Sequence, residues 1–295
     1  MTITPVTPQA MTAEQREQFE RDGYLIVRNV LSPDEVAHYA AAVDRVYAEH
    51  EAVGKLGADA SLHKLSAVAS CPELNGLVDH PAVFPLVWSM IGWNVHVYHS
   101  HLDVHPPIKQ TKPYRFEWHQ DGGRQNGELE TDPRPRLSVK LAFWLSDVSE
   151  PGRGNFKVVP GSHKMNRIDG PPSRDIEWPD PAGAIEVCVH PGDAVFFDRR
   201  IWHARSNNYS EITRKAVFFG YTFRWIATRD ERPAPEHVAR LNPVQRQLVG
   251  ALEGRIDDPV DGGDHAWGYF PDEVPLYTDL KERGLLDSSF PWLRR

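Results

Sequence analysis

Between Trp93 and Trp225 the chain is divided into short β-prone segments, separated by turns rich in Gly, Pro, Asn and Asp. This pattern is typical of an antiparallel barrel or sandwich. With 295 residues, the chain has room for one large domain in which such a core carries flanking elements. The sequence therefore predicts a mainly β fold, with candidate strands at 95–104, 137–145, 156–159, 185–189, 194–197 and 215–223.

Helices are expected on both sides of this β region. Thr12 and Gln15 form a capping box ahead of a short helix over 13–21. Ser32, followed directly by a proline, caps a longer helix over 33–50. We expect a single domain with a helical N-terminal part at about 12–92, a β core at about 93–225 and a helical or irregular C-terminal part at 226–295.

Composition and charge exclude several classes of partner. The net charge of −8 and the lack of a basic cluster argue against nucleic acid and anionic lipid. Cys71 and Cys188 are too few for a disulfide framework, which favours a reducing cytoplasm. No apolar run approaches the roughly 18 to 20 residues that span a bilayer, and the first residues do not form a signal peptide. We expect a cytoplasmic protein with a small-molecule partner, and its oligomeric state stays open.

His119-Gln120-Asp121 places an imidazole and a carboxylate two residues apart. On an extended segment, residues i and i+2 face the same side, so both groups can reach one metal. A third ligand must come from another segment. Two histidines and one carboxylate leave three metal positions open, as non-haem Fe(II) requires to bind a bidentate oxo-acid and O₂.

A second pair, His101-Leu102-Asp103, competes with this one, and only its context separates them. His101 and Asp103 lie inside a continuous strand pattern, whereas His119 and Asp121 precede a glycine pair and a long loop. His203 follows a turn and a buried strand, where a ligand can face a barrel mouth. We predict that His119, Asp121 and His203 bind one metal. His101 and Asp103 are not expected to bind it together.

Arg214 follows His203 by eleven residues. Its guanidinium can bind the distal carboxylate of 2-oxoglutarate through two parallel hydrogen bonds, which lysine does less specifically. Two alternatives stay open. A cupin-like binding or sensing protein keeps the barrel without turnover, and a zinc hydrolase uses the same three ligands but leaves Arg214 unexplained.

With these residues, the chain resembles the phytanoyl-CoA dioxygenase family of Fe(II)- and 2-oxoglutarate-dependent oxygenases. The resemblance implies a double-stranded β-helix, a jelly-roll or cupin-like core, with Fe(II), 2-oxoglutarate and O₂. It also implies that a small organic molecule is hydroxylated or otherwise oxidised, with release of succinate and CO₂. The matching features are the opening 19–27, the tetrad Trp118-His119-Gln120-Asp121, the turn 160–163, the spacing of His203 and Arg214, and the segment 242–250.

The chain departs from the family around the expected co-substrate site. Family members often carry a small hydroxyl residue two positions after the distal histidine, where this chain has Arg205. On the expected strand at 95–104, His99 and Asp103 are predicted neighbours of 2-oxoglutarate. Lys64 and Lys140, outside this strand, are alternative cationic partners of the co-substrate.

Two long polar segments, 122–136 and 164–183, interrupt the β pattern. The first follows Asp121 directly and is open to two interpretations, a lid that closes over the substrate or a solvated loop without a role. As a lid it should be mobile in the free enzyme and ordered in the complex, because it is too polar to hold itself down by apolar burial. Arg124 in this segment and the aromatic Trp144 are predicted substrate contacts. Because Asp121 fills the third ligand position, hydroxylation is favoured over halogenation. The identity of the substrate does not follow from the sequence.

Overall fold

The computed structural model describes residues 10–108, 118–168, 180–252 and 271–286. The chain divides into two compact units. We call Thr12–Lys64 with Leu102–Phe218 the sheet unit, and Met1–Met11, Leu65–His101 and Phe219–Arg295 the helical unit.

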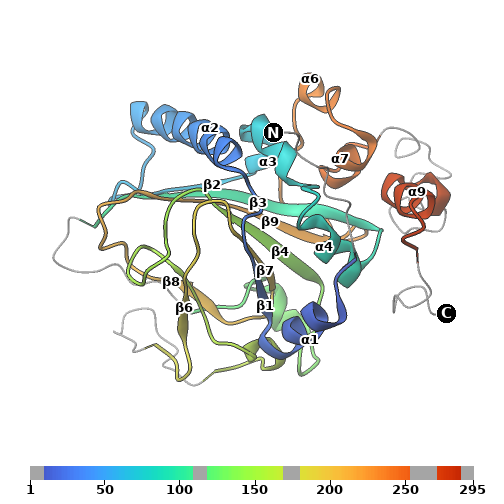
Figure 1. Cartoon of the computed structure of the whole chain (residues 1–295), viewed down its shortest axis with the longest axis horizontal. Helices are drawn as coiled ribbons and strands as arrows, with labels where there is room; N and C mark the ends of the chain where they lie inside the picture. The colour runs from blue at the N-terminus through green and yellow to red at the C-terminus, as the bar shows by residue number, and fades with distance from the viewer. Residues whose placement is uncertain (1–9, 109–117, 169–179, 253–270, 287–295) are drawn as a thin grey trace. The chain divides into compact units, whose positions relative to one another are not determined.

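The larger sheet has the strand order β1-β7-β4-β9-β3-β2. Strand β7 pairs antiparallel with both β1 and β4, and Phe196 lies opposite Leu25 on one side and Leu141 on the other. Figure 1 shows β1, β7 and β4 next to one another, with the first helix close to β1. The strands are β1 (Tyr24–Val27), β2 (Leu62–Leu65), β3 (Val95–His105), β4 (Ser138–Trp144), β7 (Ala194–Asp198) and β9 (Arg214–Phe223).

A smaller antiparallel sheet has the order β6-β5-β8, with β5 spanning Phe156–Val158, β6 Ile185–Val187 and β8 His203–Arg205. The two sheets pack through aromatic side chains. The Phe156 ring on β5 lies 4.8 Å from the Phe197 ring on β7 and 6.3 Å from the ring of Trp144 on β4, centroid to centroid. All three are at least 96% buried, and such aromatic contacts contribute about 1 kcal/mol each beyond their buried area.

The two long helices of the sheet unit begin where the sequence predicts. Helix α1 (Ala13–Asp22) follows the complete capping box of Thr12 and ends at a glycine with φ +83°, a backbone angle that favours glycine. Helix α2 (Pro33–Ala52) follows the capping box of Ser32. Both predicted starts are confirmed. Two one-turn helices, α5 (Gln125–Glu128) and η2 (Ser162–Lys164), lie in the long loops.

The helical unit holds short helices. Helix α7 ends at Leu248, and Gly250 then takes a φ of +71°. None of the helices that the structure describes is long and apolar enough to cross a membrane. They are α3 (Ala67–Ser70), η1 (Pro72–Leu77), α4 (Phe84–Ile91), α6 (Pro235–Val238), α7 (Pro243–Leu248), η3 (Pro271–Glu273) and α9 (Pro275–Glu282).

All six expected strands are present, with ends that shift by one or two residues. Of the other three strands, β1 coincides with an apolar, β-prone run at 24–27. Strands β2 and β8 were not predicted, because segments of three or four residues carry too little period-two pattern to be recognised. Strand β8 matters most, since it begins at His203.

Candidate metal centre

His119 and His203 face each other across a single antiparallel pair. The backbone N–H of His119 donates to the carbonyl of His203 at 3.0 Å, and the reverse hydrogen bond measures 2.9 Å. Directly opposed residues in such a pair project their side chains from the same face. Accordingly, the two imidazole rings lie 4.3 Å apart, centroid to centroid.

Asp121 lies on the same face as His119, because the side chains of an extended segment alternate between its two faces. The intervening Gln120 points elsewhere, since its Nε2 donates to the carbonyl of Met165 at 2.9 Å and its Oε1 accepts a hydrogen bond from Arg134. One ligand atom each from His119, Asp121 and His203 lies within 4.8 Å of the others. The structure thus brings the three predicted ligands together, and neither His101 nor Asp103 belongs to this group.

The protonation of His203 suits metal binding. Its Nδ1–H donates to the carbonyl of Ile201 at 2.9 Å, so that Nε2 keeps a free lone pair. Burial, together with the neighbouring His119, lowers the pKa of His203 to about 3. The Phe156 and Phe197 rings lie 5.3 and 5.7 Å from the imidazole and account for the burial. The ring is therefore neutral at physiological pH, as a ligand must be.

Asp121 offers one oxygen to a cation of the protein and one to the histidines. Burial alone would raise its pKa, but the charge of Lys140, with the neighbouring histidines, outweighs burial and holds the pKa well below its ordinary value. The Lys140 Nζ lies 2.9 Å from Oδ1. Among the described residues, the buried Oδ2 has no hydrogen-bond partner, and it lies 3.9 Å from Nε2 of His203.

An unpartnered buried carboxylate oxygen beside an imidazole lone pair costs free energy unless a cation lies between them. The donor set of two imidazoles and one carboxylate therefore fits a divalent metal ion. It also leaves room for an exogenous bidentate ligand, because the protein supplies only three donors. Lys140, which the sequence offered as a co-substrate partner, pairs with Asp121 in this structure.

Arg214 forms a second cluster with Asp103. It begins β9, is 2% exposed, and its Nη1 donates to Oδ2 of Asp103 at 3.3 Å. Oδ1 of Asp103 lies 2.6 Å from Nδ1 of His63. The buried Nε of Arg214 makes no hydrogen bond with the described part of the chain, so this guanidinium retains donor capacity for an anion.

Two further basic side chains lie near Arg214. Burial, with the charge of Arg214 beside it, lowers the pKa of Arg205 to about 9. Burial also lowers the pKa of His105 to about 4, and its Nε2 lies 3.9 Å from Oδ2 of Asp103. The residue that departs from the family pattern, Arg205, therefore adds positive charge near Arg214.

Four further residues were predicted to contact the substrate or the co-substrate. Trp144 is completely buried in the apolar core, where its large ring packs between the sheets, and its contact with substrate stays a prediction. The Arg124 side chain is 93% exposed, and its Nε lies 3.1 Å from Oε1 of Glu128. His99 belongs to the helical unit, where its Nδ1 lies 3.9 Å from Oδ1 of Asp230. Lys64 ends the first segment of the sheet unit, half-buried.

The predicted lid, residues 122–136, is held by polar contacts. Arg134 donates from Nε to the carbonyl of Asn126 at 2.7 Å, and its backbone N–H donates to Oδ1 of Asn166 at 3.0 Å. Asn166 in turn donates to the carbonyl of Thr131 at 2.9 Å. The expectation of a loop that cannot hold itself down considered only apolar burial and missed these hydrogen bonds.

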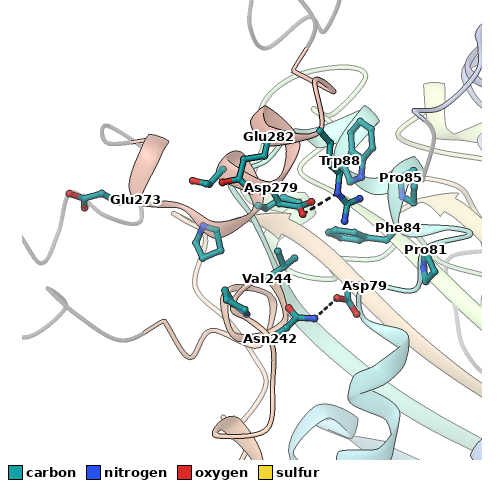
Figure 2. A pocket seen from close by; sticks show the side chains of 15 residues that line it. Asp79, Pro81, Phe84, Pro85, Trp88, Asn242, Val244, Glu273, Asp279 and Glu282 are labelled. Carbon is teal, nitrogen blue, oxygen red and sulfur yellow. Dashed lines mark hydrogen bonds and ion pairs between the residues drawn. The ribbon is translucent and has the colours of Figure 1, made fainter. Parts of the chain in front are cut away.

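The helical unit contains a groove of 720 Å³, shown in Figure 2. Its lining includes Phe84 and Trp88, and two of its carboxylates already have partners. Asp79 accepts hydrogen bonds from Asn242 and Gln245 at 3.1 and 2.9 Å, and Oδ1 of Asp279 lies 3.1 Å from Nε of Arg283. None of the residues that line the groove is a histidine or cysteine, so its chemistry suits packing better than metal binding.

Two facing antiparallel sheets with two histidines and a carboxylate gathered at the start of β8 define the class of protein as a double-stranded β-helix with a candidate metal site. The phytanoyl-CoA dioxygenase (PhyH) family model matches residues 19–216, more than half of the chain. The chain therefore belongs to the phytanoyl-CoA dioxygenase family, a family of 2-oxoglutarate-dependent non-haem iron dioxygenases.

Similar proteins support this assignment. An ectoine dioxygenase from Nocardia farcinica is 26% identical over 247 residues, which cover 73% of this chain and 79% of that protein. The peroxisomal phytanoyl-CoA dioxygenase of Mus musculus is 25% identical over 233 residues, covering 70% and 67%.

Solved structures of similar proteins confirm the expected fold. SnoK, a non-haem α-ketoglutarate-dependent carbocyclase from nogalamycin biosynthesis, matches with a TM-score of 0.56 at 26% identity, covering 85% of this chain and 97% of SnoK. HygX from Streptomyces hygroscopicus, solved with nickel and 2-oxoglutarate bound, matches with a TM-score of 0.58 at 19% identity, covering 74% and 90%.

Proposed function

We propose that this protein uses Fe(II), 2-oxoglutarate and O₂ to hydroxylate, or otherwise oxidise by two electrons, a small organic molecule. The observation that carries the proposal is the convergence of ligand atoms from His119, Asp121 and His203 within 4.8 Å. The likeness to a carbocyclase of nogalamycin biosynthesis supports a role in bacterial secondary metabolism. Cys71 and Cys188 are both free, which supports action in the cytoplasm.

We assign the metal to Nε2 of His203, Oδ2 of Asp121 and one ring nitrogen of His119. When bound, Fe(II) and 2-oxoglutarate activate O₂ for removal of a substrate hydrogen, and the co-substrate leaves as succinate and CO₂. The Ile201 carbonyl holds the His203 ring in one tautomer. Lys140 holds Oδ1 of Asp121, which turns Oδ2 toward the histidines.

Arg214 is assigned to the distal carboxylate of 2-oxoglutarate. Its fixed, buried guanidinium can orient the co-substrate, and its Nε has no hydrogen bond to a described residue. Asp103 already takes one of its nitrogens, so Asp103 contributes as a neighbour that positions the guanidinium. Arg205 adds charge that favours a dianionic co-substrate.

The test is an anaerobic titration of the protein with Fe(II) and 2-oxoglutarate, read as the metal-to-ligand charge-transfer band. Wild-type protein should develop the band, and Asp121→Ala should not. Asp34→Ala, which removes an exposed carboxylate from the start of α2, is the matched control and should behave as wild type. An unchanged band in Asp121→Ala would contradict the ligand assignment. Activity that survives without O₂ and 2-oxoglutarate would favour the zinc hydrolase instead.

A further inference from the structure

Arg199 is a buried guanidinium without a carboxylate partner among the described residues. It follows β7 and is 6% exposed. Its Nη2 donates to Oδ1 of Asn126 at 2.5 Å, whereas its buried Nε makes no hydrogen bond with any described residue. A charge removed from water without a counterion costs several kcal/mol in effective terms, so a protein retains one where a ligand provides the missing partner.

Two other arginines contact Asp198, the last residue of β7, and both are neutralised. Nη2 of Arg200 lies 2.7 Å from Oδ2 of Asp198, and Nε of Arg136 lies 2.6 Å from the same oxygen. Arg136 also pairs with Glu20 at 2.7 Å. Carboxylates are therefore placed against the neighbouring guanidinium groups and not against Arg199, so its unmet charge does not result from a general shortage of acids there.

The Arg199 guanidinium lies directly beside the metal-binding segment. The backbone carbonyl of Arg199 accepts a hydrogen bond from the backbone N–H of Asp121 at 3.0 Å. A Cβ on Gly122 would come within 2.2 Å of Nη2, and Gly122 has a φ of +111°. Only glycine leaves the space that the guanidinium occupies. Asn126, which holds Nη2, also donates to the carbonyl of Asp121 at 3.0 Å, so the same side chain contacts both residues.

We propose that Arg199 binds an oxyanion of the substrate, a carboxylate or a phosphate group, and thereby orients the substrate at the metal centre. A guanidinium with an unused Nε presents the planar donor edge that such anions bind in two-point contact. The substrate is then an organic anion whose charge neutralises Arg199. This inference rests on the proposed function, because it takes the bound anion to be what the metal centre oxidises.

The experiment uses full-length protein saturated anaerobically with Mn(II) and 2-oxoglutarate, so that the sites for the metal and the co-substrate are filled. Acetate and inorganic phosphate are titrated at constant ionic strength, and their affinities are measured by calorimetry and by the rise of the unfolding midpoint. The variants are Arg199→Met, which keeps the length of the side chain, and Arg199→Lys, which keeps its charge. Arg167→Met removes an exposed cation of the same unit as the control.

Wild-type protein and Arg167→Met should bind at least one of the two anions equally well. Arg199→Met should bind it at least tenfold more weakly, and Arg199→Lys several-fold more weakly, because an ammonium loses the two-point contact. The anion that depends more strongly on Arg199 identifies the substrate as a carboxylate or a phosphate compound. The unfolding midpoint of ligand-free Arg199→Met should not fall, because this variant removes an unpaired buried charge.

Three results would overturn the inference. These are anion binding by Arg199→Met equal to wild type, anion binding by Arg199→Lys equal to wild type, and loss of 2-oxoglutarate binding in a folded Arg199→Met protein. The last would assign Arg199 to the co-substrate. Failure of the proposed function is separate, since wild-type protein would then bind no 2-oxoglutarate with Mn(II). An anion titration without Mn(II) and 2-oxoglutarate would still measure how strongly anion binding depends on Arg199.

Discussion

Asp121 and Asp103 each stand two residues after a histidine, yet their carboxylates have different surroundings. Asp121 pairs one oxygen with Lys140, while its other oxygen is buried without a hydrogen bond to the described residues and lies 3.9 Å from His203. Asp103 has a partner on each oxygen, since His63 lies 2.6 Å from Oδ1 and Arg214 lies 3.3 Å from Oδ2.

The His-x-Asp motif identifies which side chains can donate lone pairs. Their partners in the tertiary structure decide whether those side chains bind a metal or a cation of the protein. An oxygen that faces a neutral imidazole of low pKa can accept a metal, because both groups offer lone pairs to the same point. A carboxylate bonded to a buried guanidinium has its charge neutralised already, and a metal would have to displace that cation. We therefore expect the two aspartates to respond differently to substitution.

The largest effect is expected at Asp121. Asp121→Ala should abolish Fe(II) binding at micromolar concentrations, because each of three ligands carries about a third of a binding free energy on the order of 10 kcal/mol. Asp103→Ala should keep Fe(II) affinity within about twofold of wild type, since it removes no ligand. Equilibrium dialysis with metal analysis measures both. Equal losses in the two variants would contradict the distinction between the two carboxylates.

Asp198 is a third carboxylate for comparison. It pairs with two guanidinium groups and is not one of the three candidate metal ligands. Asp198→Asn should lower the free energy of unfolding by about 3 kcal/mol, because it leaves the largely buried charge of Arg200 without its carboxylate and Arg136 with Glu20 alone. Denaturant unfolding with circular dichroism measures this. Iron affinity of the refolded variant should match wild type, and a loss of iron would connect Asp198 to the metal centre.

The same residue predicts a pH dependence. Burial alone would raise the pKa of Asp198, but Arg200 and Arg136 outweigh burial and lower the pKa below its ordinary value. A carboxylate with a lowered pKa in the folded state stabilises the protein above its unfolded pKa, near 4, and loses that contribution as the pH falls through the folded value. Wild-type stability should therefore fall below about pH 4, and Asp198→Asn should show a shallower fall.

The Asp103 cluster predicts an effect on the co-substrate. Arg214→Lys should weaken 2-oxoglutarate binding about 30-fold while iron affinity stays near wild type, because an ammonium cannot replace both hydrogen bonds of a guanidinium. Calorimetry with Mn(II)-loaded protein measures this under anaerobic conditions. Unchanged 2-oxoglutarate affinity would show that the distal carboxylate binds elsewhere, with Arg205 as the first alternative.

Substitution of Lys140 tests whether the cation beside Asp121 affects the Fe(II) affinity. Lys140→Met should weaken Fe(II) binding about tenfold, because Oδ1 of Asp121 then loses the contact that orients the carboxylate. Lys140→Arg should recover part of the affinity, since it restores a donor. Stronger Fe(II) binding in Lys140→Met would show that the lysine competes with the metal instead of positioning its ligand.

The smallest effect is expected at Arg124. From the sequence, Arg124→Ala should raise the substrate KM about tenfold, by loss of one charge-assisted hydrogen bond. The side chain is 93% exposed beside Glu128, and exposed pairs of this kind contribute little. We now expect less than a twofold change in the affinity for 2-oxoglutarate and for the acetate and phosphate probes. A tenfold change would return Arg124 to the substrate site.

Local sequence determined the features that depend on near neighbours in the chain. The capping boxes at Thr12 and Ser32 involve residues three positions apart, and both helices begin there. The side shared by His119 and Asp121 follows from the alternation of an extended segment. The core strands could be predicted because their apolar runs lie between turn residues, as at 194–197.

The tertiary structure decided what depends on partners far apart in sequence. His203 meets His119 because β8 pairs with a segment more than 80 residues earlier, and no local pattern encodes that register. Lys140 and Arg199 were not predicted in their observed positions, because a lone lysine or arginine looks the same in sequence whether its side chain faces solvent or the interior. Burial removes water from a charge, so that an unpaired charge then costs free energy. Which charges are buried is decided only when the chain packs.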